Sequence, residues 1–343
     1  MAGKGDRFTA MPHEAAIIAG AGPIGLACAI SAKRRGIDPL VIDAGALANS
    51  IVRYPIGMTF FTTPERLEIG GHPLVCAGAK ATREEALKYY RGVARTENIR
   101  VQTFTKLVNA HEVETRFGRE SVTWGRLVLA TGYFDHPNHL GVPGGGEELP
   151  HVRHYFDEAH LSYGRDVVVI GGKNSAVEAA LQLFRAGART TIIYRGKEWP
   201  KSVKYWLRPD LENRIKAGEI AARMASKVIE ITPRWVRIRG PKGEEQIAAD
   251  RVYPLIGFHP DLELFKRIGV SFDAESGRPA VDPETLQTSV PGVYVAGSVT
   301  AGYKISEIFI ENGRFDGDKI FGTAAERERA RELYQGIRRE TGE

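Results

Sequence analysis

Two glycine-rich loops are the stretches of this sequence whose residue types and spacing could do chemistry. The first reads Gly20-x-Gly22-x-x-Gly25, with Pro23 inside it, and lies between a β-type run and an apolar helical pattern. In such a loop the first glycine permits a tight turn, the second lets the backbone approach a pyrophosphate, and the third lets the helix pack on the strand. The N-terminus of the helix adds N–H donors and a positive dipole. The loop therefore predicts a phosphate cradle.

Asp43 supplies the second part of this site. It lies 23 residues after Gly20, at the end of a second β-type run, PLVIDAG. An acid at that place bonds the ribose hydroxyls of a dinucleotide. A glycine turn that binds no ligand would need no acid in register. We therefore predict that a dinucleotide is bound by Gly20, Gly22, Pro23, Gly25 and Asp43.

The second loop begins 151 residues after the first and departs from the pattern. It comprises Gly171, Gly172, Lys173, Asn174, Ser175 and Ala176. Lys173 stands where the second glycine is expected, so its side chain must point away from the turn or lie along a phosphate. The alternative is a loop that binds nothing and remains only as scaffold.

The residues beyond the second loop indicate a different nucleotide from the first. At the position that corresponds to the acid of the first site stands Tyr194, and Arg195 follows it. An acid would repel the 2′-phosphate of NADPH, whereas an arginine pairs with it through two parallel hydrogen bonds. The basic run continues with Lys197, Lys201 and Lys204, although a solvated loop would also account for the lysines. This pattern favours NADPH over NADH.

The first site carries an acid, and the second carries basic residues. Two such different nucleotide sites in one chain indicate a flavin dinucleotide and a nicotinamide dinucleotide, FAD and NADPH. A flavin accepts a hydride from NADPH and passes electrons on singly or in pairs. The flavin then carries the chemistry, and no side chain is predicted to act as a catalytic nucleophile. Positioning of the two rings is the main task of such a protein.

An internal repeat supplies the elements that position these loops. Residues 14–30 are echoed by 166–183, and each copy continues into a second short strand, at 39–45 and at 190–196. Two βαβ units follow, and they predict an α/β fold with two Rossmann-like, doubly wound domains. Further strands are expected within 126–133, 251–260 and 288–299.

The Pro- and Gly-rich stretch 135–150 is the best candidate for a linker. A return linker is expected near the later strand, so that one domain is inserted in the other. The predicted FAD-binding domain comprises 1–135 and 257–343, and the predicted NADPH-binding domain comprises 150–252. The predicted linkers are 136–149 and 253–256.

Composition narrows the class of protein. The 343 residues exceed the usual size of one core, and 43% apolar and 26% charged residues are ordinary for a soluble protein. A net charge of +5 from 47 basic and 42 acidic residues is no signature of nucleic-acid binding. The uncharged stretch 15–32 is typical of a strand, a turn and a helix rather than of a membrane span. No signal-peptide pattern opens the sequence and only two cysteines occur, so a cytoplasmic location is expected.

The chain resembles the two-domain flavoprotein reductases related to low-molecular-weight thioredoxin reductase, and within them the bacillithiol disulfide reductase family. The similar stretches are YPIGMTFFTTPERLEIGG (54–71), HYFDEAH (154–160), VVVIGGKNSAVEAAL (167–181), IGFHPD (256–261) and IFIENGRFDG (308–317). The shared GGKNSA implies that the Lys173 loop still binds NADPH. The resemblance also implies a homo-oligomer.

The resemblance further implies the roles of individual residues toward FAD. The first loop and Asp43 would hold its adenine half. The remaining contacts would come from Tyr54, Phe60, Phe61 and Thr62 along the isoalloxazine, Thr131 and Gly132 in the turn near it, and Gly297, Lys304 and Ile305 at the ribityl and pyrimidine end.

The cysteines depart from both families. Thioredoxin reductases carry Cys-x-x-Cys upstream of the second loop, but residues 140–170 hold no cysteine, which excludes a dithiol relay of that type. Bacillithiol disulfide reductases carry a cysteine at the position of Ile24. Cys28 lies one helical turn further on, where a small packing residue is commoner than a reactive thiol. Cys76 has no base near it in the sequence.

The electron acceptor is therefore left open by the sequence. One hypothesis is a low-molecular-weight disulfide of the bacillithiol type, reduced without the family cysteine. Another is ferredoxin, flavodoxin or a quinone, and a third is a non-catalytic flavoprotein that senses NADP(H). No metal site is predicted, because no cysteine or acid lies at a fixed spacing from the histidines. These are His136, His139, His151, His154 and His160.

Overall fold

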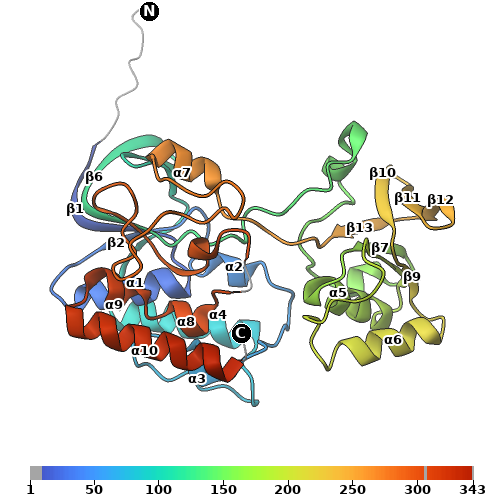
Figure 1. Ribbon diagram of the computed structural model, residues 1–343, viewed down its shortest axis with the longest axis horizontal. Helices are drawn as coiled ribbons and strands as arrows, with labels where there is room; N and C mark the ends of the chain where they lie inside the picture. The colour runs from blue at the N-terminus through green and yellow to red at the C-terminus, as the bar shows by residue number, and fades with distance from the viewer. Residues whose placement is uncertain (1–9, 305–306, 342–343) are drawn as a thin grey trace, which may run out of the picture. The chain divides into compact units, whose positions relative to one another are not determined.

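The structure is a computed structural model that describes residues 10–304 and 307–341. The chain divides into two units, which Figure 1 shows with their helices and strands labelled. Unit 1 comprises Met1–Val52, Gly57–His136 and Phe258–Glu343, and unit 2 comprises Arg53–Ile56 and Pro137–Gly257. Most of the predicted linker 136–149 thus belongs to unit 2, and the second crossing lies between residues 257 and 258.

Unit 1 is built on a seven-stranded sheet in the order β3-β2-β1-β6-β5-β4, with β14 paired to β6. Strands β3, β2, β1, β6 and β14 run parallel, whereas β4, β5 and β6 form an antiparallel meander. The strands are β1 (Ala10–Ala19), β2 (Leu40–Ile42), β3 (Arg100–Gln102), β4 (Lys106–Asn109), β5 (Glu112–Thr115), β6 (Gly118–Leu129) and β14 (Val293–Val295).

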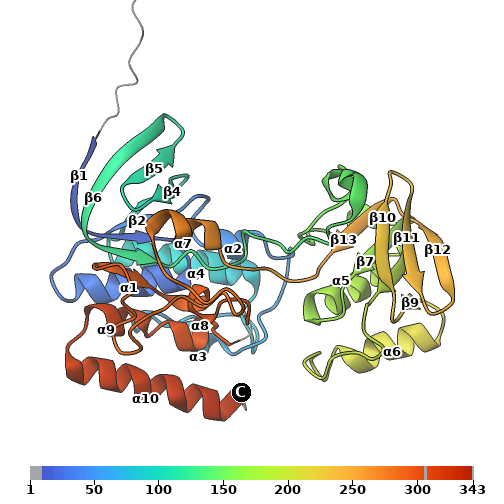
Figure 2. The same ribbon diagram turned by 45° about the horizontal axis from the view of Figure 1, so that its top comes forward.

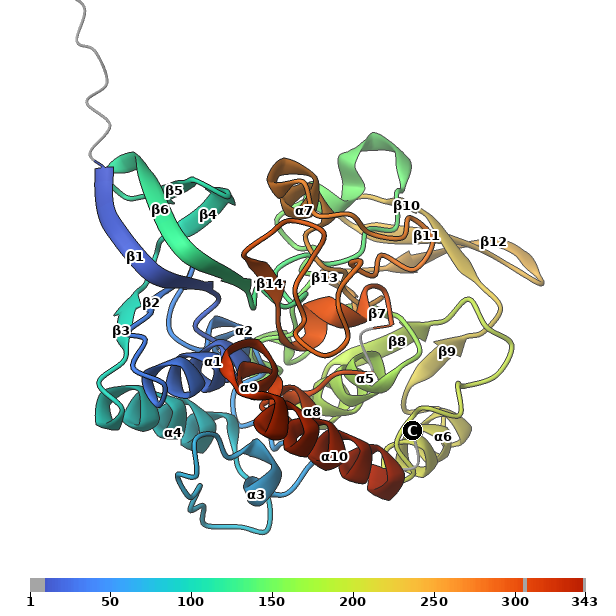
Figure 3. The same ribbon diagram turned by 60° about the vertical axis from the view of Figure 1, so that its left-hand side comes forward.

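The helices of unit 1 cover both faces of this sheet. They are α1 (Pro23–Lys33), α2 (Asn49–Val52), α3 (Pro64–Leu67), α4 (Arg83–Thr96), α7 (Leu262–Ile268), α8 (Ile310–Gly313), α9 (Asp316–Phe321), α10 (Ala324–Thr341) and the 3₁₀ turn η3 (Gly297–Ala301). Helix α1 is buried from Gly25 to Ala32, since it packs between the sheet and α9 (Figure 3). Helix α4 begins at a capping box in which Thr82 and Glu85 exchange hydrogen bonds.

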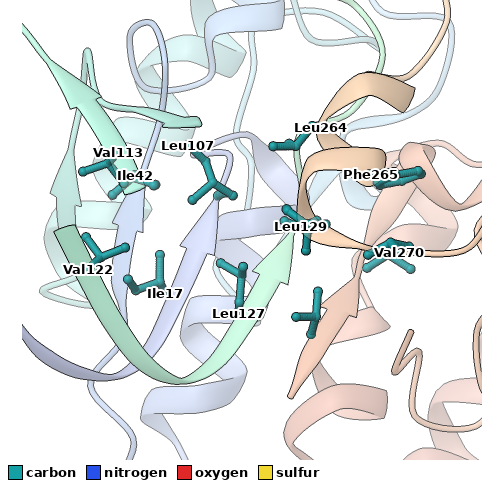
Figure 4. Close-up of a cluster of buried hydrophobic side chains, with 14 of the residues drawn as sticks. Ile17, Ile42, Leu107, Val113, Val122, Leu127, Leu129, Leu264, Phe265 and Val270 are labelled. Atoms are coloured by element: carbon teal, nitrogen blue, oxygen red, sulfur yellow. The ribbon is translucent and has the colours of Figure 1, made fainter. Parts of the chain in front are cut away.

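The core of unit 1 follows the two-residue period of its strands. Ile17 of β1 faces a cluster that includes Leu129 of β6 and Phe265 of α7 (Figure 4). Its neighbour Ile18 points the other way, into a second cluster with Cys28 of α1. Both faces are therefore buried, which explains why the central strands read as continuous apolar runs.

Unit 2 combines a parallel and an antiparallel sheet (Figure 2). The four parallel strands lie in the order β13-β7-β8-β9, with β7 (Asp166–Ile170), β8 (Arg189–Ile193), β9 (Ala221–Arg223) and β13 (Arg251–Pro254). The antiparallel strands are β10 (Lys227–Ile231), β11 (Trp235–Gly240) and β12 (Gly243–Ala248). The helical segments are α5 (Asn174–Arg185), α6 (Arg208–Lys216) and the 3₁₀ turns η1 (Pro143–Glu148) and η2 (His160–Ser162).

The parallel sheet of unit 2 is likewise covered on both faces. Val169 packs with Ala180 of α5 in one cluster, and Val168 packs with Val236 of β11 in the other. Residues 253 and 254 of the predicted return linker belong to β13, which pairs with β7. The predicted α/β class with Rossmann-like units is confirmed by these parallel sheets and by the solved structure that is compared below. Within the described residues, no helix has the length and apolar character that crossing a membrane requires.

Candidate functional site

The predicted FAD residues of unit 1 follow the carboxyl ends of four parallel strands. Gly20 comes directly after β1, Asp43 after β2, and Thr131 and Gly297 lie just beyond β6 and β14. The strand ends are aligned, because Ala19 is in register with Ile42 and Leu129, and Leu129 with Val295. In open parallel sheets ligands bind outside these carboxyl ends. The fold thus brings the four residues to one edge.

The first glycine loop has the geometry of a phosphate cradle. Gly20 adopts φ +115°, and a Cβ there would lie 2.2 Å from the carbonyl oxygen of Ala130. A Cβ on Gly25 would lie 1.8 Å from the carbonyl oxygen of Gly20, so the helix packs directly on the turn. A Cβ on Gly22, by contrast, would meet nothing within 4 Å. The loop is therefore tight where it must turn and open where a phosphate would approach.

Asp43 is held against this loop by backbone amides. Its Oδ2 accepts a hydrogen bond of 2.7 Å from the amide of Ala21, and its Oδ1 accepts one of 2.8 Å from the amide of Gly45. Two hydrogen bonds to different oxygens fix the orientation of the carboxylate. The acid is thus fixed beside the loop, where it fits the ribose of a dinucleotide.

Thr131 carries a buried hydroxyl whose hydrogen-bonding capacity is unused. Its Oγ1 is among the buried side-chain atoms of the described residues for which no partner is found. The next residue, Gly132, turns the chain at φ +67°. Buried polar atoms are normally satisfied, so an orphaned hydroxyl at a strand end fits a ligand with polar edges, such as a flavin.

Gly297, the second residue after β14, is fixed by a buried acid. Gly297 adopts φ +74°, and its amide donates a hydrogen bond of 2.8 Å to Oδ2 of Asp316 on α9. Burial raises the pKa of Asp316, while Lys319, 3.5 Å away, acts in the opposite direction. Sequence reasoning missed Asp316, because its partner lies 19 residues away and no motif marks it.

The other predicted flavin contacts differ in burial and in the unit to which they belong. Phe60 is buried and its amide donates to the carbonyl of Ala81 at 2.9 Å, while Phe61 and Thr62 are half-buried. Tyr54 belongs to the short stretch that is grouped with unit 2. Lys304 is exposed, and Ile305 lies outside the described residues.

In the second loop an aromatic ring takes the place of the acid. A Cβ on Gly172 would lie 2.3 Å from the ring of Tyr194, and one on Gly196 would lie 2.4 Å from it. The ring also stacks on Trp199, with centroids 5.6 Å apart and planes at 14°. Position 172 therefore requires glycine, because a side chain there would clash with the ring of Tyr194. The sequence showed that the acid is absent but not that a ring is wedged between two glycines.

Asn174 ties the second loop to the basic segment beyond it. Its Oδ1 accepts a hydrogen bond of 2.9 Å from the amide of Lys204, and its Nδ2 donates to the carbonyl of Ser202 at 3.3 Å. Gly171, at φ +142°, turns against the carbonyl of Leu255. Position 204 thus lies beside the start of α5, although 30 residues separate it from Asn174.

The cations around this loop have no acidic partners within the described part of the chain. Among the described residues no hydrogen bond or ion pair is found for the exposed side chains of Lys173, Arg195, Lys197, Lys201 and Lys204. Other arginines of the same unit are paired, Arg189 with Asp166 and Arg223 with Glu245, each at 2.7 Å. A cluster of uncompensated cations beside a helix N-terminus fits an anionic ligand with several phosphates.

Neither cysteine has the environment of a reactive thiol. Cys28 is fully buried on α1, and burial, with Asp316 and Asp318, raises its pKa well above the usual value. Cys76 is half-buried and its thiol contacts the carbonyl of Gly78 at 3.1 Å. The side chain of Ile24 lies over Gly297, where a Cβ would be 3.0 Å from its Cγ1. A thiolate is the reactive form of cysteine, so burial works against Cys28.

Comparison with known proteins identifies the family. A family model described as pyridine nucleotide-disulphide oxidoreductase matches residues 17–297. The chain belongs to this family. It is 46% identical over 326 residues to the bacilliredoxin reductase Bdr of Bacillus subtilis, covering 93% of this chain and 99% of that protein. The predicted resemblance to bacillithiol disulfide reductases is thereby confirmed.

One solved structure and a second sequence relative agree with this assignment. The bacillithiol disulfide reductase of Bacillus cereus matches with a TM-score of 0.86 and 40% identity, over 95% of this chain and all of that one. A ferredoxin–NADP reductase of Ignicoccus hospitalis is 29% identical over 89% of this chain and 96% of its own length. The chain is an FAD-dependent NADPH oxidoreductase, and the prediction of FAD and NADPH as cofactors is confirmed.

Proposed function

We propose that this oxidoreductase binds FAD at the carboxyl edge of the unit 1 sheet and NADPH at the second loop, and that it reduces a low-molecular-weight disulfide of the bacillithiol type. The observation that carries the proposal is the contrast between the loops, one with a fixed acid at Asp43 and one with unpaired cations such as Arg195. The disulfide is inferred from the 46% identical bacilliredoxin reductase.

The net reaction would convert NADPH, a proton and one disulfide into NADP⁺ and two thiols. When bound, FAD supplies the hydride acceptor for NADPH and the store of electrons for the disulfide. The chain would bind and orient. Gly22 leaves room for the pyrophosphate, Thr131 offers a buried hydroxyl to the flavin, and Arg195 provides a cation for the 2′-phosphate.

The proposal requires that electrons reach the disulfide without a thiol of this chain. Ile24 stands at the position of the family cysteine, and Cys28 is fully buried with a raised pKa. A dithiol relay also needs two neighbouring sulfurs, and Cys76 lies in a separate loop. Both thiols are free, which fits a reducing compartment, and we infer the cytoplasm.

A second candidate acceptor is ferredoxin or another carrier of single electrons. It is favoured by the environment of the two cysteines, Cys28 being fully buried and Cys76 lying in a separate loop, because direct transfer from a flavin needs no protein sulfur. The ferredoxin–NADP reductase of Ignicoccus hospitalis is related over nearly its whole length. This candidate differs from the first only in the acceptor.

One experiment separates the two candidates. The purified flavoprotein is reduced anaerobically with NADPH, and bacillithiol disulfide, ferredoxin and a quinone are then offered in turn while the flavin absorbance is followed. We expect bleaching by NADPH and rapid recovery with the disulfide. Recovery with ferredoxin alone would select the second candidate, and failure of NADPH to bleach the flavin would contradict both.

A further inference from the structure

Three side chains that belong to neither glycine loop come together in unit 2. They are His139, Glu147 and His154, and one potential ligand atom from each lies within 4.8 Å of the others. Nδ1 of His139 lies 3.6 Å from Oε2 of Glu147. The two imidazole rings meet edge to face, with centroids 4.7 Å apart and planes at 62°. Two imidazoles and a carboxylate are a common set of ligands for a metal ion.

Separate parts of the fold place these side chains. His139 follows Asn138, whose amide donates to the carbonyl of Gly257 at 2.9 Å. Glu147 lies on η1, which packs against β10. His154 follows a short parallel pairing in which the amide of Arg153 donates to the carbonyl of Val252 in β13 at 2.9 Å. The cluster is therefore fixed by backbone pairing and not by one flexible loop.

The carboxylate of Glu147 is oriented before any ligand binds. Its Oε2 accepts a hydrogen bond of 2.8 Å from the amide of Leu140, and its Oε1 accepts one of 2.8 Å from the amide of Gly141. Metal-binding carboxylates are typically held by such outer hydrogen bonds. Each oxygen keeps a lone pair that can face a cation.

His154 supplies a second observation that fits a ligand at this cluster. Its Nδ1 is buried and has no hydrogen-bond partner among the described residues. A ring nitrogen of imidazole is a common ligand of metal ions in proteins.

We propose that His139, Glu147 and His154 form a site for a divalent transition-metal ion of the Zn²⁺ type, with water as a fourth ligand. Mixed nitrogen and oxygen ligands suit Zn²⁺, whereas Mg²⁺ and Ca²⁺ prefer oxygen alone. Tetrahedral Zn²⁺ with bonds of about 2.1 Å sets its ligand atoms roughly 3.4 Å apart. The pair at 3.6 Å already meets this spacing, and a side-chain rotation would close the widest gap.

A bound metal ion would cross-link three segments of unit 2. It would join the segment that enters the unit at His139 to η1 and to the segment that runs beside β13. The sequence did not predict this site, because the acid lies 8 positions after one histidine and 7 before the other, and no standard ligand spacing results. The expected role is structural, separate from the transfer of electrons.

Titration of the full-length, untagged flavoprotein with Zn²⁺ alone, after treatment with a chelator, tests the proposal by calorimetry. We expect one equivalent to bind in the unaltered protein. His139→Ala and His154→Ala should each weaken binding at least tenfold, about the smallest loss seen even for outer partners of a metal site. His151→Ala and Cys76→Ser are matched controls, and each should bind Zn²⁺ as the unaltered protein does.

Thermal melting separates loss of the site from loss of the fold. Without metal, His139→Ala should melt like the unaltered protein, because this side chain is exposed. Added Zn²⁺ should raise Tm in the unaltered protein and in both controls but not in the two histidine variants. Absence of stoichiometric binding, or equal binding in the unaltered protein and the histidine variants, would overturn the assignment.

Discussion

At the scale of single residues, the choice between NADPH and NADH is expected to depend on Arg195. Its side chain is exposed and has no partner among the described residues, so a 2′-phosphate would meet an uncompensated cation. A hydrogen bond to a charged group contributes about 1.5–3 kcal/mol, reduced here by solvent screening. We predict that Arg195→Ala raises KM for NADPH about tenfold and leaves KM for NADH unchanged.

Steady-state kinetics with both nucleotides measure this effect. Lys216→Ala removes a cation on α6 of the same unit and serves as the control, with both KM values unchanged. An equal loss for NADPH and NADH in the Arg195 variant would show that the arginine does not contact the 2′-phosphate.

Gly20 and Gly22 should respond differently to the same methyl group. At Gly20 a Cβ would lie 2.2 Å from a backbone oxygen and φ is +115°, so Gly20→Ala should cost about 3 kcal/mol or more in stability. Gly22 has φ −76° and open space around its Cβ. We predict that Gly22→Ala keeps the Tm of the FAD-free protein but loses FAD. Melting curves measure the stability of the two variants, and the flavin absorbance after purification measures their FAD content. Retained FAD in Gly22→Ala would argue against the phosphate cradle.

Ile24 tests whether a protein thiol can be restored. Cysteine is smaller than isoleucine, so Ile24→Cys fits the space over Gly297 and Gly313 without a clash. We predict faster turnover of bacillithiol disulfide in this variant and an unchanged rate of flavin reduction by NADPH. Ile24→Ser is the control, since it makes the same space without a thiol. Equal disulfide turnover in the Cys and Ser variants would exclude a thiol contribution at this position.

At the scale of elements, the attachment of α10 should depend on pH. Hydrogen bonds from Thr323 at the start of the helix, and then Arg35 of unit 1 at 2.8 Å, lower the pKa of Glu326 to about 2. A carboxylate with a lowered folded pKa stabilises fully above its ordinary value, here 4.5, and the contribution is lost as pH falls toward 2. The helix is therefore anchored best at neutral pH.

Glu326→Gln makes this dependence measurable. The variant should have a lower Tm than the unaltered protein at pH 7, and the difference should shrink as pH falls from 4.5 toward 3. Glu332→Gln alters an acid on the same helix and serves as the control. A Tm difference between the Glu326→Gln variant and the unaltered protein that does not change with pH would contradict the lowered pKa of Glu326.

At the scale of the whole molecule, the sequence predicts what is local and misses what is assembled across long separations. Gly20, Gly25 and the run before them lie within a few residues, so their loop could be predicted. Asp43 could be found because the length of a βαβ unit fixes its distance. Nothing in the sequence brings Asp316 to Gly297, or Glu147 to two histidines, since packing of distant elements creates those contacts.

The insertion of one unit in the other yields the broadest prediction. Residues 137–257 hold two apolar clusters of their own, one on each face of the β13-β7-β8-β9 sheet. We predict that a fragment of these residues folds alone and binds NADP⁺. A fragment that ends at residue 250 lacks β13, which pairs with β7, and lacks Leu255, whose carbonyl oxygen packs against Gly171.

Circular dichroism reports on folding in the two fragments. Tryptophan fluorescence, which comes from Trp199 beside the loop together with Trp206 and Trp235, reports on binding. The longer fragment should melt cooperatively and respond to NADP⁺, while the shorter one should do neither. Because β13 lies at one end of the sheet order, its removal leaves β7 without a neighbour on that side and opens the apolar face under β11. A shorter fragment that folds and binds would place the essential boundary before β13 and remove this strand from the nucleotide-binding unit.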